Sequence, residues 1–270
     1  MVQLEPNLQL VLQHLTTCGA VLPAEATAAM DHSIPIKRSE AGLKSLVLWG
    51  RLLAHNGKDY LIAEGYNNAT AKGKAVSFEA KFYFSQDGAK WADLPTVDAD
   101  TAARAVKLRL QLSGDPAFQY TVDDAAAGTA APEPAADGED NGKYVVTEVQ
   151  RLRCIIDSVN SATAVQPKGY FIANAHNQVV PNRLFSGLDY PDKLESYVHR
   201  SAALEEGKGG GLAGDVRGSW SLHYDSFKGV AVLRSLLFPG YCFYYSSHDL
   251  TWGSLYVGDG LQNNDLVFML

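Results

Sequence analysis

The 270-residue chain has little of what marks disulfide, membrane or nucleic-acid-binding proteins. Its three cysteines, Cys18, Cys154 and Cys242, lie far apart among apolar neighbours and form no Cys-x-x-Cys pair, which predicts buried free thiols in a reducing compartment. Lys and Arg total 23 against 30 acidic residues, so we expect no basic surface for nucleic acid or anionic lipid. No apolar run approaches the roughly 18 residues of a membrane helix, and no base precedes the first apolar segment, so we expect neither a membrane span nor a secretory signal.

Residue patterns that carry catalysis are equally scarce. The seven histidines are scattered and no His-Glu-x-x-His pair is present, so we expect no metal and no cofactor. His223, near Asp225, and His248 come nearest to acid–base pairs, but strand ends and turns that face water explain them better. We therefore predict a protein that is not an enzyme, with no catalytic, cofactor-binding or metal-binding residue.

One nucleotide-binding pattern does match by its letters. The loop 207–214 contains Gly-Gly-Gly-Leu-Ala-Gly from Gly209, which satisfies G-x-G-x-x-G. The motif needs a strand before it and a helix after it, so that a phosphate meets the helix N-terminus. The flanking residues fit neither element, and a flexible loop is the better interpretation. A soluble ligand-binding or enzymatic domain that uses this loop with Asp215 or Asp225 is the alternative hypothesis.

Apolar spacing predicts helices first and strands afterwards. Leucines and Val11 recur at helical spacing from Leu4 to Leu15, and the Ala-rich segment Pro23–Met30 predicts a second short helix. We expect these two helices to form a hairpin whose packing partner the sequence does not reveal. Further helices are expected over 98–108, 144–159 and 192–199, and short strand pieces over 164–172.

Turn signals between apolar runs predict antiparallel strands. Asn56-Gly57 separates the runs 46–53 and 60–65, and Asp87-Gly88 separates 78–84 from 91–94, as in β-hairpins. The last fifty or so residues predict a meander of strands over 219–224, 229–237, 241–245 and 252–257.

The predicted fold class is therefore α+β, a predominantly antiparallel β-sheet with short helices and an N-terminal helical hairpin. An acidic low-complexity insert at 123–142 has no large apolar residue and is expected to be a solvated loop. The expected organisation is a helical segment 1–40, a first β-rich half 41–122, the loop 123–142, and a second β-rich half 143–270. We expect the two halves to form one domain.

Two apolar features suggest contacts beyond an ordinary core. The sequence ends on Leu266-Val267-Phe268-Met269-Leu270, and burying such side chains is worth roughly 1.5–3 kcal/mol each. We expect this end to be docked, in the protein's own core rather than on a partner. Six aromatic residues crowd into 241–256, and half of them would face outward on a sheet with one buried face. Two interpretations stay open: half-buried residues that cap the sheet, or a protein–protein face. The residues are Tyr241, Phe243, Tyr244, Tyr245, Trp252 and Tyr256.

A series of sequence blocks also carries a resemblance. From about residue 43 to the end, they resemble the radial spoke head protein 9 family, most specifically through the last long block and the terminal one. The insert 123–142 and the Gly-rich run depart from the family pattern. The blocks, in order, are Leu-Trp-Gly-Arg-Leu at 48–52, Gly-Asp-Pro-Ala-Phe-Gln-Tyr at 114–120, Asn-Arg-Leu-Phe-Ser-Gly-Leu at 182–188, Gly-Ser-Trp-Ser at 218–221, Val-Leu-Arg-Ser-Leu-Leu-Phe-Pro-Gly at 232–240, Tyr-Val-Gly at 256–258 and Asp-Leu-Val-Phe-Met-Leu at 265–270.

The resemblance implies a function that composition and spacing do not give. It implies a non-catalytic structural subunit of the axonemal radial spoke head, which assembles through protein–protein contacts and supports ciliary and flagellar motility. The implied partners are other spoke head and neck proteins, foremost spoke head proteins 4 and 6, with no nucleic acid and no membrane. The implied location is the cytoskeleton of the cytoplasm, in the axoneme of a cilium or flagellum.

Overall fold

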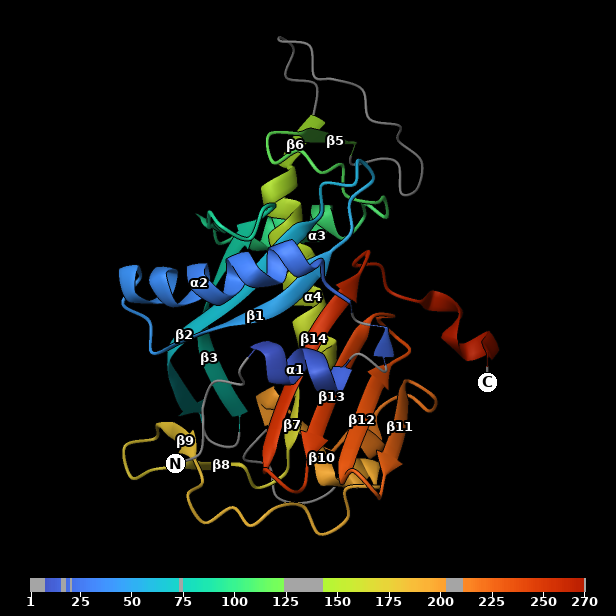
Figure 1. Cartoon of the computed structure of the whole chain (residues 1–270). Helices are drawn as coiled ribbons and strands as arrows, with labels where there is room; N and C mark the ends of the chain where they lie inside the picture. The colour runs from blue at the N-terminus through green and yellow to red at the C-terminus, as the bar shows by residue number, and fades with distance from the viewer. Residues whose placement is uncertain are drawn as a thin grey trace.

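A twisted eight-stranded sheet forms the centre of the protein, in the order β11-β12-β13-β14-β1-β2-β3-β4 (Figure 1). The computed structural model describes residues 8–15, 18–19, 21–72, 75–123, 143–202 and 211–269. Helices lie on both faces of the sheet, and the predicted α+β class, mostly antiparallel, is confirmed. The strands are β1 (Ser45–Leu52), β2 (Tyr60–Lys72), β3 (Ala75–Ser85), β4 (Ala92–Asp93), β11 (Trp220–Asp225), β12 (Val230–Ser235), β13 (Tyr241–Ser246) and β14 (Thr251–Gly258).

The predicted hairpins and the predicted meander are confirmed. Strands β1 to β4 pair antiparallel in chain order, and Gly57 and Gly88 in their turns have positive φ of 71° and 74°. Such values favour glycine, which explains why Asn-Gly and Asp-Gly mark these positions. Strands β11 to β14 also pair antiparallel in order.

A short parallel pairing joins the two groups of strands. Gly50 to Leu52 of β1 pair with Tyr256 to Gly258 of β14. A Cβ atom at Gly50 would lie 2.2 Å from the carbonyl oxygen of Tyr256, so only glycine allows this approach. The sequence offers no turn signal for a contact between residues this far apart, and the pairing was not predicted.

One face of the sheet is covered by α1 (Leu8–Leu15) and α2 (Ala24–Glu40), with α1 lying over β13 and β14 (Figure 1). Val11, Leu15 and Met30 are buried against this face, which is the packing partner of the N-terminal helices. Two helices are present, but they pack on the sheet, and a helical hairpin is not clearly formed. The second helix also runs ten residues beyond the predicted Met30 and contains Pro35. Burial of Met30 and packing of Ile34 offset the backbone hydrogen bond that Pro35 lacks.

The opposite face carries the largest hydrophobic core, built on α4 (Glu148–Thr163) and two short strands, β7 (Val165–Pro167) and β10 (Tyr197–His199). Tyr197 lies edge-on to Phe243 and Tyr245, with ring centroids 5.8 and 6.5 Å apart. Because both faces are covered, every residue of β13 is buried. The interpretation of the aromatic residues as an outward protein–protein face is therefore wrong: five of the six are buried and Trp252 is half-buried.

Three local predictions need correction. The expected helix 144–159 begins only at Glu148, because β6 (Lys143–Thr147) pairs with β5 (Gln119–Asp123) and Thr147 then caps the helix. The expected helix 192–199 is a 3₁₀ turn, η2 (Leu194–Ser196), followed by β10. The expected helix 98–108 is shorter, α3 (Ala99–Ala105).

The remaining elements are short. They are β8 (Phe171–Ala173), which pairs with β9 (Val179–Pro181), and the 3₁₀ turns η3 (Arg200–Ala202), η4 (Leu212–Gly214) and η5 (Asn264–Met269). The predicted strand pieces within 164–172 correspond to β7 and the start of β8. Residues 124–142 of the acidic insert lie outside the described residues. In the described part of the chain, no helix combines the length and apolarity needed to cross a bilayer.

The C-terminal segment is only partly docked. Leu266 is buried, and Asn263 ties the segment to the end of β12 through its N–H, 2.8 Å from the Leu237 carbonyl oxygen. Phe268, in contrast, is 86% exposed. The expectation that this end closes the protein's own core is wrong for Phe268, because the short helical turn η5 places Leu266 inward and Phe268 outward.

Candidate functional site

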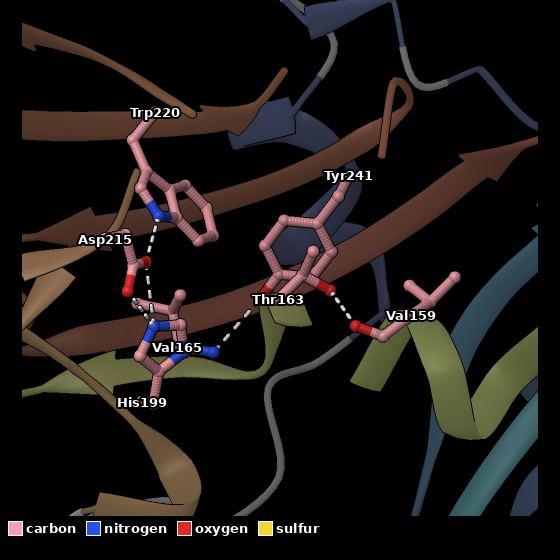
Figure 2. Close-up of polar contacts among 7 residues, drawn as sticks. All are labelled: Val159, Thr163, Val165, His199, Asp215, Trp220 and Tyr241. Atoms are coloured by element: carbon pink, nitrogen blue, oxygen red, sulfur yellow. Dashed lines mark hydrogen bonds and ion pairs between the residues drawn. The ribbon is translucent and has the colours of Figure 1, made fainter. Parts of the chain in front are cut away.

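A histidine–aspartate pair lies where β10, η4 and β11 meet, on the α4 side of the sheet (Figure 2). The carboxylate of Asp215 lies 2.8 Å from Nε2 of His199, and the indole Nε1 of Trp220 donates to the same carboxylate at 2.6 Å. Both side chains are largely buried, with 19% and 29% exposed. Asp215 is the residue that the alternative hypothesis placed beside the Gly-rich loop, and its carboxylate is occupied by these two donors.

The pair has part of the geometry of a hydrolase site. A histidine oriented by a carboxylate becomes a general base when its other nitrogen faces a nucleophile. Here Nδ1 of His199 is buried and has no hydrogen-bond partner among the described residues. The cluster acts instead as a clamp between segments: Val198 forms a bridge with Gly211, and the carboxylate joins the end of β10 to the start of β11.

Neighbouring polar contacts fix the layer behind the clamp (Figure 2). Thr163 Oγ1 donates to the Val159 carbonyl oxygen at 2.7 Å, within the last turn of α4. The backbone N–H of Val165, at the start of β7, donates to the hydroxyl of Tyr241 on β13 at 3.3 Å. Burial raises the pKa of Tyr241 to about 12, so the hydroxyl stays neutral. The first contact closes the last turn of α4, and the second secures the start of β7 to the sheet.

A buried ion pair joins β2 to η3. Nη1 of Arg200 lies 2.9 Å from Oε1 of Glu64, and Glu64 is 4% exposed. Burial lowers the pKa of Arg200, but the Glu64 carboxylate more than offsets this, so the pKa is raised. The guanidinium also lies over the ring of Phe78. The pair has the chemistry of a structural link, since each charge is neutralised by the other.

A second buried polar cluster centres on Glu148 at the start of α4. Its carboxylate accepts hydrogen bonds from the hydroxyl groups of Tyr60 and Tyr120 and from the backbone N–H of Gly114. Burial, reinforced by the bond to Glu148, raises the pKa of Tyr120 to about 12. Arg151 donates to the carbonyl oxygens of Leu108, Leu110 and Gln111 and lies over the Tyr120 ring. These side chains hydrogen-bond to one another and to the backbone of residues 108–114, so the cluster positions that segment.

Sequence reasoning singled out none of the polar residues in these clusters except Asp215. The Thr147–Gln150 capping box at the start of α4 is the one local pattern near these clusters that could have been recognised in the sequence. In the structure Gln150 Oε1 accepts a hydrogen bond from the Thr147 N–H at 3.0 Å. The pairing of His199 with Asp215, and of Arg200 with Glu64, depends on tertiary contacts across 16 and 136 residues.

The remaining predicted candidates do not assemble. Residues 203–210 lie outside the described chain, and Gly211 leads into η4, a turn of three residues, and then into a strand. The helix that a phosphate-binding loop requires is thus replaced by β11. His223 and His248 are exposed, as expected for positions facing water. Asp225 accepts hydrogen bonds from the backbone N–H groups of Phe227 and Lys228 in the β11–β12 turn.

The three cysteines carry thiol groups and form no disulfide. Cys154 and Cys242 are buried as predicted, and Cys18 is half-buried. A hydrogen bond with the Cys18 thiol, together with burial, raises the pKa of Cys242. Within the part of the chain that the structure describes, no group of three or more His, Cys, Asp or Glu side chains could hold a metal ion.

Comparison with known proteins identifies full-length relatives. No protein-family model matches the chain. "Radial spoke head protein 9 homolog" of Xenopus tropicalis is 32% identical over 98% of this chain and 99% of the relative. The proteins of the same name from Danio rerio and Homo sapiens are 30% and 27% identical, over 93% and 98% of this chain and 94% and 99% of the relatives.

Proposed function

The chain belongs to the radial spoke head protein 9 family, and we propose from this that it is a structural, non-catalytic subunit of the axonemal radial spoke head. In this role it helps to assemble the spoke head by protein–protein contacts and so supports ciliary and flagellar motility. The observation that carries the proposal is the similarity to a spoke head protein over 98% of the chain and 99% of the relative.

The polar clusters of the structure support a structural role. The His199–Asp215 pair has the orienting carboxylate of a catalytic pair but no group on its second nitrogen among the described residues. Arg200 with Glu64, and Glu148 with its tyrosines, satisfy each other inside the fold. The hydrogen bonds of these groups join segments of the chain: β10 to β11, β2 to η3, and α4 to the residues before it.

We further propose that the partners are other head and neck components of the spoke, with spoke head proteins 4 and 6 foremost, and that the protein resides in the axoneme. Neither nucleic acid nor a membrane is part of this proposal. Phe268, exposed at the end of η5, offers apolar surface of the kind that an assembly contact would bury.

Co-expression tests the proposed function. The full chain is produced with a spoke head protein 4 or 6 from the same organism and analysed by size-exclusion chromatography with light scattering. A stable complex of defined mass is expected, and a mixture of the free proteins at micromolar concentrations contradicts the proposal. A thermal-shift screen with nucleotides serves as the control for ligand binding, because a bound ligand raises the melting temperature by mass action. A shift that is lost on G209A and G211A substitution would favour the ligand-binding alternative.

A further inference from the structure

The two outer strands of the sheet end it in different ways. At one side β4 has two residues, Ala92 and Asp93, and offers almost no edge. At the other side β11 has six residues, Trp220–Asp225, pairs with β12 without a register shift, and contains neither proline nor lysine. Soluble proteins normally protect a long edge with prolines, lysines, bulges or a covering segment, because its free backbone groups pair readily with another strand.

Hydrogen-bond parity shows which backbone groups of β11 face the open side. The N–H of Leu236 donates to the Ser219 carbonyl oxygen at 2.8 Å, one step beyond the pair Trp220–Ser235. Bonded and non-bonded pairs alternate in an antiparallel ladder. Residues 221, 223 and 225 therefore direct their N–H and C=O groups toward β12, while Leu222 and Tyr224 direct theirs away from the sheet. The bond from the Ser247 N–H to the Gly229 carbonyl oxygen agrees with this pattern from the other side of β12. It shows that Ala231 and Leu233 direct their backbone N–H and C=O groups toward β13 and not toward β11.

The side chains beside this edge define two faces. Leu222 and Tyr224 pack against the main hydrophobic core on the α4 side. On the other face, α1 covers β13 and β14 but stops short of the edge, leaving a hollow of about 440 Å³ over β11 and β12. His223, Lys228 and Arg234 line it, and among the described residues of its lining Asp225 is the acidic one. In a chain of net charge −7, this is a locally basic surface.

We propose that β11 is the docking edge of the assembly and takes one extended segment of a spoke head partner as a ninth strand of the sheet. The added strand would carry apolar residues on the side of Leu222 and Tyr224. On the side of the hollow it would carry acidic residues, facing His223, Lys228 and Arg234. Backbone hydrogen bonds supply the affinity in this mode and the alternating side chains supply the specificity. The inference rests on the proposed function and names the surface through which it operates.

Amide hydrogen exchange in the co-purified complex tests strand addition directly. We expect the N–H groups of Leu222 and Tyr224 to exchange faster in the isolated chain than those of 221, 223 and 225, which face β12. In the complex we expect the exchange of Leu222 and Tyr224 to slow at least about tenfold, which restores protection along the whole strand. Unchanged exchange at these two amides in a complex that does form would overturn the proposal, and so would protection of the same amides in a dimer of this chain alone.

A pair of substitutions at one position separates backbone pairing from side-chain contact. Leu222→Pro removes an outward N–H without removing a bond to β12, and proline is tolerated at such edge positions. Leu222→Ala keeps the N–H and removes most of the side chain. We expect L222P to weaken the complex at least about tenfold and more than L222A does, while its melting curve stays cooperative. Equal weakening by both variants would overturn the proposal. If L222P does not fold, the exchange measurement on the unaltered protein still decides the matter.

The two proposals fail in different ways. If the unaltered chain forms no complex with its spoke head partners, the proposed function is wrong. If the complex forms but Leu222 and Tyr224 exchange as in the free chain, the proposed function stands and the docking edge lies elsewhere.

Discussion

Strands β13 and β11 belong to one meander, lie two positions apart in the sheet, and have nearly opposite environments (Figure 1). Every residue of β13 is buried, because α1 lies on one face and β7 and β10 lie on the other. In β11 only Trp220 is buried. The two strands also differ in composition: β13 has aromatic or apolar residues on both of its faces, whereas one face of β11 carries Ser221, His223 and Asp225.

With the proposed docking at β11, one sheet would separate stability from assembly. The central strand carries its aromatic residues inside the molecule, where they hold the layers together. The edge strand keeps one core-facing side, through Leu222 and Tyr224, and leaves its backbone and the opposite side accessible. A protein that must fold before it joins a complex benefits from this division, since contacts with a partner are then made by residues that the isolated fold can spare.

The largest expected effect is at the centre of the sheet. Phe243→Ala removes a fully buried ring between Tyr197 and Trp252 and should lower the free energy of unfolding by about 3–5 kcal/mol. The matched control is Phe227→Ala in the β11–β12 turn, where the ring is 93% exposed and the change should stay within about 0.5 kcal/mol. Urea denaturation of both variants measures the difference. Similar losses for the two would contradict the contrast between the covered strand and the edge.

The same contrast explains what the sequence could predict. Glycine-containing turns are local signals, and Asn56-Gly57 and Asp87-Gly88 located the hairpins of β1 to β4 correctly. The aromatic residues of β13 were ambiguous because alternation tells which residues share a face but does not tell whether a second layer covers that face. The layers come from α1 and from β7 with β10, which lie more than forty residues away in the sequence from β13.

The candidate site shows the same limit more strongly. Asp215 was noticed for its position beside a Gly-rich loop, but its partners His199 and Trp220 come from tertiary structure. The parallel pairing of β1 with β14 has no local signal either, since it depends on Gly50 admitting the Tyr256 carbonyl. Pro35 lies inside α2 although proline normally ends or kinks a helix, because packing of the helix against the sheet outweighs one missing hydrogen bond.

The C-terminal segment also contains one buried and one exposed apolar residue, Leu266 and Phe268, and the next largest loss of stability is expected there. Leu266→Ala should cost about 2–3 kcal/mol, near the lower end for buried leucine, because a short turn can relax around the gap. Phe268→Ala should leave stability almost unchanged, within about 0.5 kcal/mol, because the ring is exposed. Thermal and urea unfolding measure both variants, and a large loss in F268A would restore the view that this ring belongs to the core.

The clamp at the start of β11 should have a moderate effect. Asp215→Asn keeps an acceptor for Trp220 but removes the charge that faces His199, and we expect a loss of about 1–2 kcal/mol at neutral pH. Asp225→Asn is the control, since its carboxylate accepts only backbone N–H groups in an exposed turn. Its effect should be under about 1 kcal/mol. If the clamp positions the edge strand, exchange of the β11 amides should also quicken in D215N and stay unchanged in D225N.

The smallest effect is expected at His14, on the boundary between the covered strands and the hollow. Its ring stacks on Tyr244 of β13 at a centroid distance of 4.7 Å and also lines the hollow beside β11. Burial lowers the pKa of His14; Asp249 opposes this and Lys228 adds to it. The unfolded chain therefore binds a proton at a higher pH than the folded chain, so this contribution is fully present above the unfolded pKa of about 6.5 and is lost as the pH falls from there through the lower pKa of the folded chain.

His14→Phe keeps a ring over Tyr244 and removes the titration. Between about pH 7 and pH 5, the free energy of unfolding should fall less steeply in H14F than in the unaltered protein, as measured by urea denaturation at each pH. Parallel slopes would show that His14 is hydrated equally in both states and that the hollow reaches further over β13 than the structure places it. If the difference in slope between the unaltered protein and H14F widens when a partner strand covers the hollow, His14 lies at the border of the docking edge. The reason is that added burial lowers the pKa of His14 further.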